Sequence, residues 1–208
     1  MQKLLFLLIS LFMLTACSKE DTPLPDYVQD LADLQTNGNG QAFRITFDNN
    51  RSFSLSNNTG GLKADTTYRV LALYTQGTES VRLTDFAQIL APEAREYDKQ
   101  TVKHDAINLM AMWKTPRYIN LRFQIKGTHS GTHYFGFKRF DIIENADGSK
   151  TLPVRLIHNQ NNDPEYYARE SYISLPLTNM SDELETGRDS IRIIVNTYKG
   201  ETQRTYVF

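Results

Sequence analysis

The sequence has little cysteine and little net charge. Cys17 is the single cysteine among 208 residues, so the chain cannot form an internal disulfide and must fold through burial of apolar side chains. The formal net charge is −1 at pH 7, and no stripe of lysine and arginine is visible. A nucleic-acid-binding domain usually carries such a stripe, so the sequence predicts no nucleic acid partner.

Sequence motifs for catalysis are also missing. There is no Gly-x-Ser-x-Gly segment and no phosphate-binding glycine loop, because Gly60-Gly61 has the composition of a turn. The sequence therefore predicts no catalytic residue, no cofactor and no enzyme activity. A hydrolase whose two carboxylates lie far apart in the sequence is the remaining enzymatic alternative.

Two segments have side chains that bind metals in other proteins. His129 and His133 flank a predicted hairpin loop, but no third ligand has a matching spacing, so we interpret both as exposed turn residues. Residues 159–165 form a polar loop in which Asp163 and Glu165 could hold calcium. This loop lacks the alternating acids of a dedicated calcium loop, and we interpret it as a solvated connector. The sequence predicts no metal site.

The N-terminal residues have the pattern of an export signal. Lys3 precedes an apolar run over residues 4–14, which is shorter than the ~20 residues that a transmembrane helix needs. Leu14-Thr15-Ala16-Cys17 resembles the lipobox of bacterial lipoproteins, in which the cysteine thiol is acylated and becomes the new N-terminus. We expect a signal peptide over residues 1–16 and lipidation of Cys17, which would attach the protein to a membrane.

Residues 17–26 are expected to form a tether. The segment Ser18-Lys19-Glu20-Asp21 is similar, in part, to the acidic surface-export signal of Bacteroidetes lipoproteins, and a spacer with two prolines follows it. We expect an outer membrane lipoprotein that faces either the cell surface or the periplasm.

Strict alternation of apolar and polar residues dominates the rest of the chain. Phe43, Ile45 and Phe47 are predicted to share one buried face, and residues 67–76 form a predicted central strand. Residues 119–125 have an apolar face and a polar face, on which Asn120 and Arg122 are expected to meet solvent. Asp147-Gly148 and Lys199-Gly200 are predicted hairpin turns. The fold class is therefore all-β, with a possible short helix only within residues 84–100.

A family resemblance rests on several of these segments. Asp26-Tyr27, the segment Tyr68-Arg69-Val70-Leu71-Ala72, residues 105–113 and Tyr118-Ile119-Asn120-Leu121 resemble the NigD-like lipoproteins of Bacteroidetes. The resemblance implies an OB-like β-barrel domain, here residues 27–103, followed by a β-sandwich domain over residues 104–208. It also implies an association with production of, or self-protection against, the bacteriocin nigrescin.

Tyrosines and short hydroxyl motifs supply the remaining candidate sites. Tyr166, Tyr167 and Tyr172 cluster with Arg169 after the polar loop and are candidate ligand-facing residues, since tyrosine and arginine are favoured at interfaces. Asp65-Thr66-Thr67 and Asp189-Ser190-Ile191 resemble O-glycosylation motifs of Bacteroidetes, with Thr66 and Ser190 as acceptors. We predict a non-catalytic binding or interaction module of the cell envelope, with an unidentified protein or glycan as its ligand.

Overall fold

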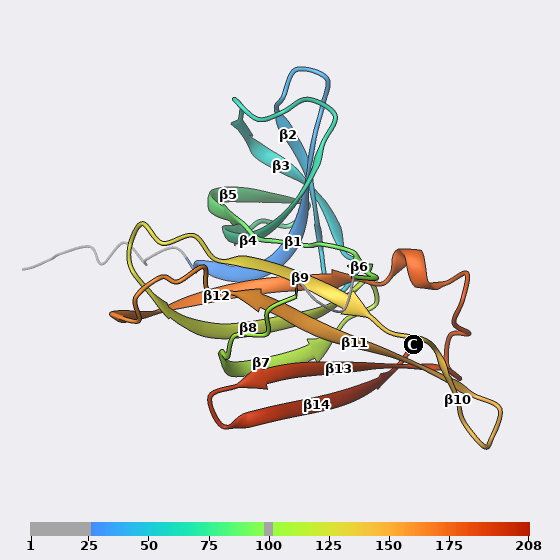
Figure 1. The fold of residues 1–208 in the computed structure, drawn as a ribbon. Coiled ribbons are helices and arrows are strands. Elements are labelled where there is room, and N and C mark those ends of the chain that lie inside the picture. Colours follow the sequence, from blue (N-terminus) through green and yellow to red (C-terminus); the bar gives the residue numbers. More distant parts are fainter. Residues whose placement is uncertain (1–25, 98–101) are drawn as a thin grey trace, which may run out of the picture.

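The computed structural model describes residues 26–97 and 102–208, which form a β-barrel and a β-sandwich (Figure 1). The predicted signal peptide and Cys17 lie outside the described residues, as does most of the predicted tether. Within the described part of the chain, no helix has the length and hydropathy to cross a membrane.

Five strands close the barrel in the order β1-β2-β3-β5-β4. They are β1 (Val28–Thr36), β2 (Ala42–Phe47), β3 (Ser52–Thr59), β4 (Thr67–Gln76) and β5 (Ser80–Gln88). Strand β1 pairs with β4 to complete the ring, and β3 and β5 form its one parallel pair. The predicted OB-like barrel is confirmed, and β4, like every strand of the closed ring, is paired on both edges.

One aromatic residue of the barrel does not lie where the alternation predicts. Ile45 and Phe47 are buried, whereas Phe43 is 44% exposed. The pairing of β2 with β3 shifts register between Ala42 and Arg44, and Ala42 takes the inward position. The prediction for Phe43 is wrong because a β-bulge changes which face a side chain occupies.

The sandwich has a three-stranded and a six-stranded sheet. The first contains, in spatial order, β12 (Tyr167–Pro176), β8 (Tyr118–Gly127) and β7 (Asn108–Lys114). The second contains β14 (Gly200–Val207), β13 (Ser190–Thr197), β11 (Lys150–Asn159), β9 (Tyr134–Arg139) and β6 (Ala94–Arg95), with β10 (Ile143–Glu144) beside β11. A 3₁₀ turn, η2 (Thr178–Met180), follows β12.

The interior of the sandwich is filled from both sheets. On β8, the predicted apolar stripe is confirmed, because Ile119, Leu121, Phe123 and Ile125 are each no more than 2% exposed. They pack in one cluster with residues of β11 and β13. Full burial of a side chain of this size contributes ~1.5–3 kcal/mol, so this stripe is a main source of stability.

Residues 89–95 connect the two domains and contact both sheets of the sandwich. After β5, Ser174 N–H donates to Leu90 C=O at 2.9 Å, and β6 then pairs with β9. The described part of residues 84–100, where the sequence left room for one short helix, holds the end of β5 and β6 instead. The boundary predicted from the sequence, between residues 103 and 104, lies after this connecting segment and after β6.

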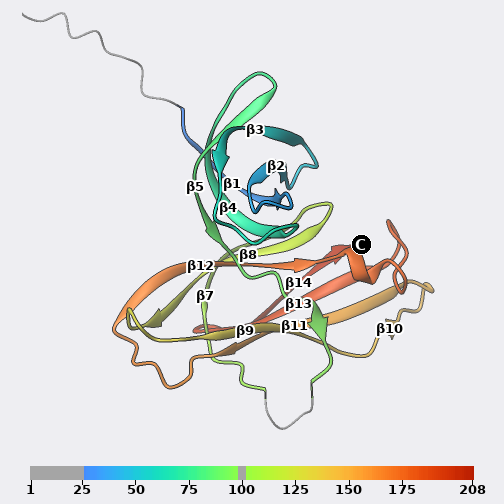
Figure 2. The same ribbon diagram turned by 90° about the horizontal axis from the view of Figure 1, so that it is seen from above.

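The barrel packs against the outer face of the three-stranded sheet, next to β8 and β12 (Figure 1 and Figure 2). This contact buries Asn120 completely, although its position on the polar face of β8 predicted exposure. The prediction for Asn120 is wrong because the sequence does not indicate which sheet face a second domain will cover.

Candidate functional site

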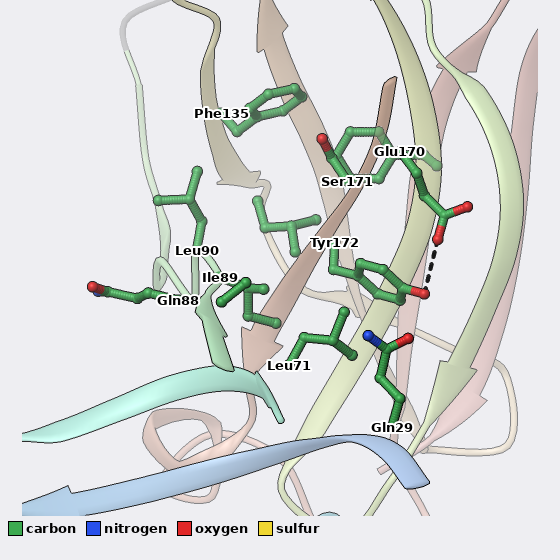
Figure 3. Close-up of a pocket in the computed structure, with 12 residues that line it drawn as sticks. Gln29, Leu71, Gln88, Ile89, Leu90, Phe135, Glu170, Ser171 and Tyr172 are labelled. Atoms are coloured by element: carbon green, nitrogen blue, oxygen red, sulfur yellow. Dashed lines mark hydrogen bonds between the residues drawn. The ribbon is translucent and has the colours of Figure 1, made fainter. Parts of the chain in front are cut away.

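A groove of about 470 Å³ lies at the junction of the barrel and the sandwich (Figure 3). The barrel contributes Gln29 from β1 and Leu71 from β4, and the connecting segment contributes Ile89 and Leu90. Ala87 and Gln88, at the end of barrel strand β5, also line the groove, and the sandwich contributes the remaining walls. Its side chains are Phe123, Phe135, Glu170, Ser171, Tyr172 and Ile173.

Both faces of β12 contribute to the groove, because β12 is an edge strand of its sheet. Ser171 and Ile173 point between the two sheets, and Glu170 and Tyr172 point towards the barrel, as strand alternation requires. Phe123 and Phe135, whose ring centroids lie 5.2 Å apart, come from the two facing sheets. The groove therefore reaches from the surface into the seam between the sheets.

Glu170 is held by two polar neighbours at the rim. Arg122 donates to it from Nε and Nη2, both at 2.8 Å, and Tyr172 Oη donates to Oε1 at 3.0 Å. The hydrogen bonds from Arg122 hold the pKa of Glu170 below its usual value. Partial burial, followed by the hydrogen bond and charge of Glu170, raises the pKa of Tyr172. Near pH 7 the Glu170 carboxylate is therefore ionised and the Tyr172 hydroxyl is neutral, and the hydroxyl donates to the carboxylate.

The four candidate ligand-facing residues do not form one surface. Tyr166 and Tyr167 are 73% and 56% exposed, and their ring centroids lie 6.5 Å apart. Arg169 donates to Gly131 C=O at 3.1 Å, while Tyr172 lines the groove. The structure thus places one of the predicted residues in the groove.

A second polar cluster, which the sequence analysis missed, joins the two domains. Arg69 of β4 is 5% exposed and bonds to both carboxylate oxygens of Asp48, at 2.6 and 2.8 Å. It also reaches the sandwich, through Asn120 Oδ1 at 3.0 Å and Ser174 Oγ at 3.1 Å. The one available signal was an arginine within the apolar strand over residues 67–76.

Asp33 of β1 completes this interdomain cluster. It pairs with Arg69 and with Arg117, and it accepts hydrogen bonds from Tyr118 Oη at 3.0 Å. Burial, with the nearby charge of Asp33 as the next cause, raises the pKa of Tyr118 to about 12. The Arg69 guanidinium lies 3.9 Å from the centroid of the Tyr118 ring. Two arginines face two aspartates here, so the cluster is neutral and structural rather than poised for chemistry.

A buried chain of hydrogen bonds joins His158, His133 and Asp163 at the C-terminal end of β11. His158 Nδ1 donates to Asp105 C=O at 3.0 Å, and its Nε2 lies 2.8 Å from His133 Nδ1. His133 Nε2 lies 3.1 Å from Asp163 Oδ2, and Thr128 donates to Asp163 through its amide and hydroxyl groups. Each ring nitrogen is already bonded. The interpretation of His133 as an exposed turn residue is wrong, whereas His129 is exposed.

The metal candidates are separated by the fold. Asp163 bonds to Thr128 and His133, and Glu165 pairs with Lys126 at 3.3 Å. Among residues 26–97 and 102–208, no group of three histidine, cysteine or acidic side chains has the arrangement of a metal site.

The two candidate glycosylation sites lie at the starts of strands. Thr66 is half-buried just before β4, and its hydroxyl donates to Ala64 C=O at 2.9 Å. Ser190 begins β13 between Thr151 of β11 and Val207 of β14. The preceding Asp189 is buried and accepts from the backbone of Lys150 and Glu185. These two backbone hydrogen bonds give Asp189 a structural role that does not depend on glycosylation of Ser190.

Comparison with known sequences decides the family. The profile of the NigD-like C-terminal beta sandwich domain matches residues 89–208. The chain belongs to the NigD-like family. The resemblance seen in the sequence is thereby confirmed. A search of curated protein sequences finds no match.

Several solved structures share the fold of this chain. A NigD-like immunity protein from Bacteroides caccae is 20% identical, with a TM-score of 0.69 over 88% of this chain and 98% of the other. A protein named toxin-related, from Parabacteroides distasonis, is 16% identical, with a TM-score of 0.68 over 88% and 93%. A protein named as a lipoprotein, from Bacteroides fragilis, is 13% identical, with a TM-score of 0.59 over 86% and 96%. At these identities the likeness shows the fold.

Proposed function

We propose that this NigD-like protein is a non-catalytic binding module of the cell envelope, and that its ligand occupies the groove between barrel and sandwich. The observation that carries the proposal is the composition of the groove. Leu71, Leu90, Phe123 and Phe135 provide an apolar lining, and the polar rim is small and fixed. Binding sites for ligands commonly combine such a lining with a few oriented polar groups.

The polar groups of the groove favour binding over hydrolysis. Glu170 is the one carboxylate among the described residues that line it, and Arg122 holds that carboxylate in its ionised form. A glycoside hydrolase needs two converging carboxylates, one of them with a raised pKa. The hydrolase alternative therefore has no support in this groove.

We also propose that the protein is a lipoprotein of the outer membrane, attached through Cys17 and facing the cell surface or the periplasm. The lipobox-like sequence supports this, and a fold relative from Bacteroides fragilis is named as a lipoprotein. The Cys17→Ser variant should move from the membrane fraction to the soluble fraction. Mass spectrometry of the native protein should find acyl groups on residue 17, and an unmodified thiol would contradict the anchor.

A photo-crosslinking experiment tests the groove. The crosslinking amino acid p-benzoylphenylalanine replaces Tyr172 in cells of the source bacterium, and Met110, an exposed residue of β7, serves as the matched control position. Irradiation should give a specific adduct at position 172 that is missing at position 110. Equal labelling at both positions, or none at either, would contradict a ligand in the groove.

Bacteriocin immunity or production is the second candidate function. It is supported by the names of two fold relatives, one called a NigD-like immunity protein and the other toxin-related. Deletion of the gene should then change bacteriocin output or sensitivity. If both are the same in the deletion strain and the parent, this candidate is removed.

A further inference from the structure

We propose that the occupant of the groove is an extended polypeptide segment that adds to the edge of β12 as a further β-strand. This inference rests on the proposed binding function and names the chemistry of its ligand. Its support comes from the backbone of β12, from the side chains below it, and from the opposite seam of the same sandwich.

The edge of β12 already accepts a strand-like segment from this chain. The connecting segment forms a parallel bridge in which Leu90 lies opposite Ile173, with the Ser174 amide donating to Leu90 C=O at 2.9 Å. Before Tyr172, no strand pairs with this edge in the part of the chain that the structure describes. The bridge therefore shows that the edge is accessible and geometrically able to pair.

The direction of the Ser174 amide identifies the backbone groups that remain at the edge. In a strand, the N–H and C=O groups of every second residue point to the same side. Since the amide of Ser174 points away from β8, the amides of Tyr172 and Glu170 also point away from it. An added strand over this stretch would receive hydrogen bonds at a spacing that a polypeptide backbone matches and a glycan does not.

The side chains below the edge favour apolar residues at alternate positions of the added strand. Residues on one face of that strand would lie over Phe123 and Phe135, in the seam between the sheets. Residues on the other face would meet the barrel at Leu71 and the rim at Tyr172. The geometry therefore selects an extended peptide with apolar side chains facing the seam, and more tolerant positions facing the barrel.

The opposite seam of the sandwich is closed by side chains. There, Arg204 and Tyr206 of β14 each donate to Met112 C=O of β7 at 2.8 Å. Side chains that cover an edge in this way prevent strand addition. At the start of β12, Arg169 Nη2 donates to Gly131 C=O at 3.1 Å, so the open part of the edge begins at Glu170. Over Glu170–Tyr172 the described residues provide no such cover, because the Tyr172 hydroxyl and the Arg122 guanidinium are both directed to the Glu170 carboxylate. The two seams thus differ in the one property that strand addition requires.

The test uses the full-length lipidated protein in detergent solution. The probes are blocked octapeptides that alternate threonine with leucine, valine, phenylalanine or tyrosine, labelled for fluorescence polarisation. Matched peptides carry N-methyl groups at alternate positions, which removes backbone donors and blocks pairing. We expect binding to the unmethylated peptides, affinity weaker by about tenfold after methylation, and slower hydrogen exchange of the β12 amides in the complex.

Two variants locate the binding site. Leu71→Arg adds a charge to the barrel wall of the groove and should weaken binding by about tenfold, because an unpaired charge would be desolvated there. Met110→Arg introduces the same residue at the β7 edge and should leave affinity within about twofold. Unfolding curves establish that both variants are folded.

The outcomes separate the inference from the proposed function. Equal affinity for methylated and unmethylated peptides would overturn strand addition while leaving a peptide-binding groove. Absence of peptide binding, with crosslinking retained at position 172, would overturn the peptide and indicate another ligand such as a glycan. Loss of both results would overturn the inference and the proposed function together.

Discussion

Arg69 Nε of the barrel lies 3.1 Å from Ser174 Oγ of the sandwich, and both residues are buried. Ser174 Oγ donates in turn to Asn120 Oδ1 at 2.6 Å. One arginine therefore connects β4 of the first domain to β8 and β12 of the second. Because Leu71 lies two residues from Arg69 and Tyr172 lies two residues from Ser174, this contact also fixes the two walls of the groove relative to each other.

Replacement of Arg69 should destabilise the protein strongly. Arg69→Met leaves Asp33 and Asp48 with fewer partners in a buried site, and loss of one partner from such a cluster costs about 3–5 kcal/mol. Chemical denaturation measures the free energy of unfolding. Arg122→Met is the matched control, since it removes an equally well-formed pair with Glu170 whose side chains are 42% and 35% exposed. It should cost about 1 kcal/mol or less.

If the two variants lose equal stability, the interdomain cluster does not hold the domains together more firmly than a surface pair. If only Arg69→Met loses stability, binding at the groove should be measured as well. Its groove walls should no longer be aligned, so binding at the groove should weaken even at temperatures where the variant stays folded.

Acid should destabilise the protein through the buried histidine chain. Burial, the largest cause, lowers the pKa of His158 below its usual 6.5. Between these two pKa values, His158 binds a proton in the unfolded chain but not in the folded chain. The free energy of unfolding therefore decreases as the pH falls below about 6.5, until the pH reaches the folded-state pKa. Denaturation midpoints at pH 7.5 and pH 5.5 should differ, and His158→Gln should reduce that difference.

Asp163 adds a second loss at lower pH. The hydrogen bonds from the Thr128 hydroxyl and amide, with a smaller contribution from His133, lower the pKa of Asp163 from 3.8. The stabilisation that this carboxylate contributes is therefore complete above about pH 3.8 and is lost as the pH falls through its folded-state pKa. His129→Gln is the matched control for His158→Gln, because the exposed His129 ring lies outside the buried chain of hydrogen bonds.

The sequence predicts residues that follow a local pattern well, and it predicts residues that are buried by contact between the two domains poorly. The stripe at Ile119 to Ile125 and the hairpin turns are local patterns, and they are found as predicted. Asn120 and Arg69 owe their burial to contact between domains, which no local pattern records. The groove also depends on contact between domains, since β1, β4, β5, β8, β9 and β12 each contribute to it. Among its residues, only Tyr172 was predicted to face a ligand.

Gly131 should be intolerant of even a methyl group. A Cβ built on Gly131 would lie within 2.3 Å of both carboxylate oxygens of Asp163. Asp163 cannot move aside easily, because Thr128 and His133 hold it. We expect Gly131→Ala to cost about 1–3 kcal/mol, measured by thermal or chemical unfolding. Gly60→Ala, whose Cβ would meet only Gln41 Cγ at 3.9 Å, should be nearly neutral. Equal effects of the two substitutions would show that Asp163 is not fixed.

The β-bulge in β2 predicts opposite results for two phenylalanines of the same strand. Phe47 is 3% exposed and packs against Tyr74, with ring centroids 4.7 Å apart, so Phe47→Ala should cost about 3–5 kcal/mol. Phe43 is 44% exposed, outside the barrel core, and Phe43→Ala should cost less than about 1 kcal/mol. Uninterrupted alternation would bury both rings and make both substitutions costly. The difference in their free energies of unfolding therefore measures where β2 shifts its register.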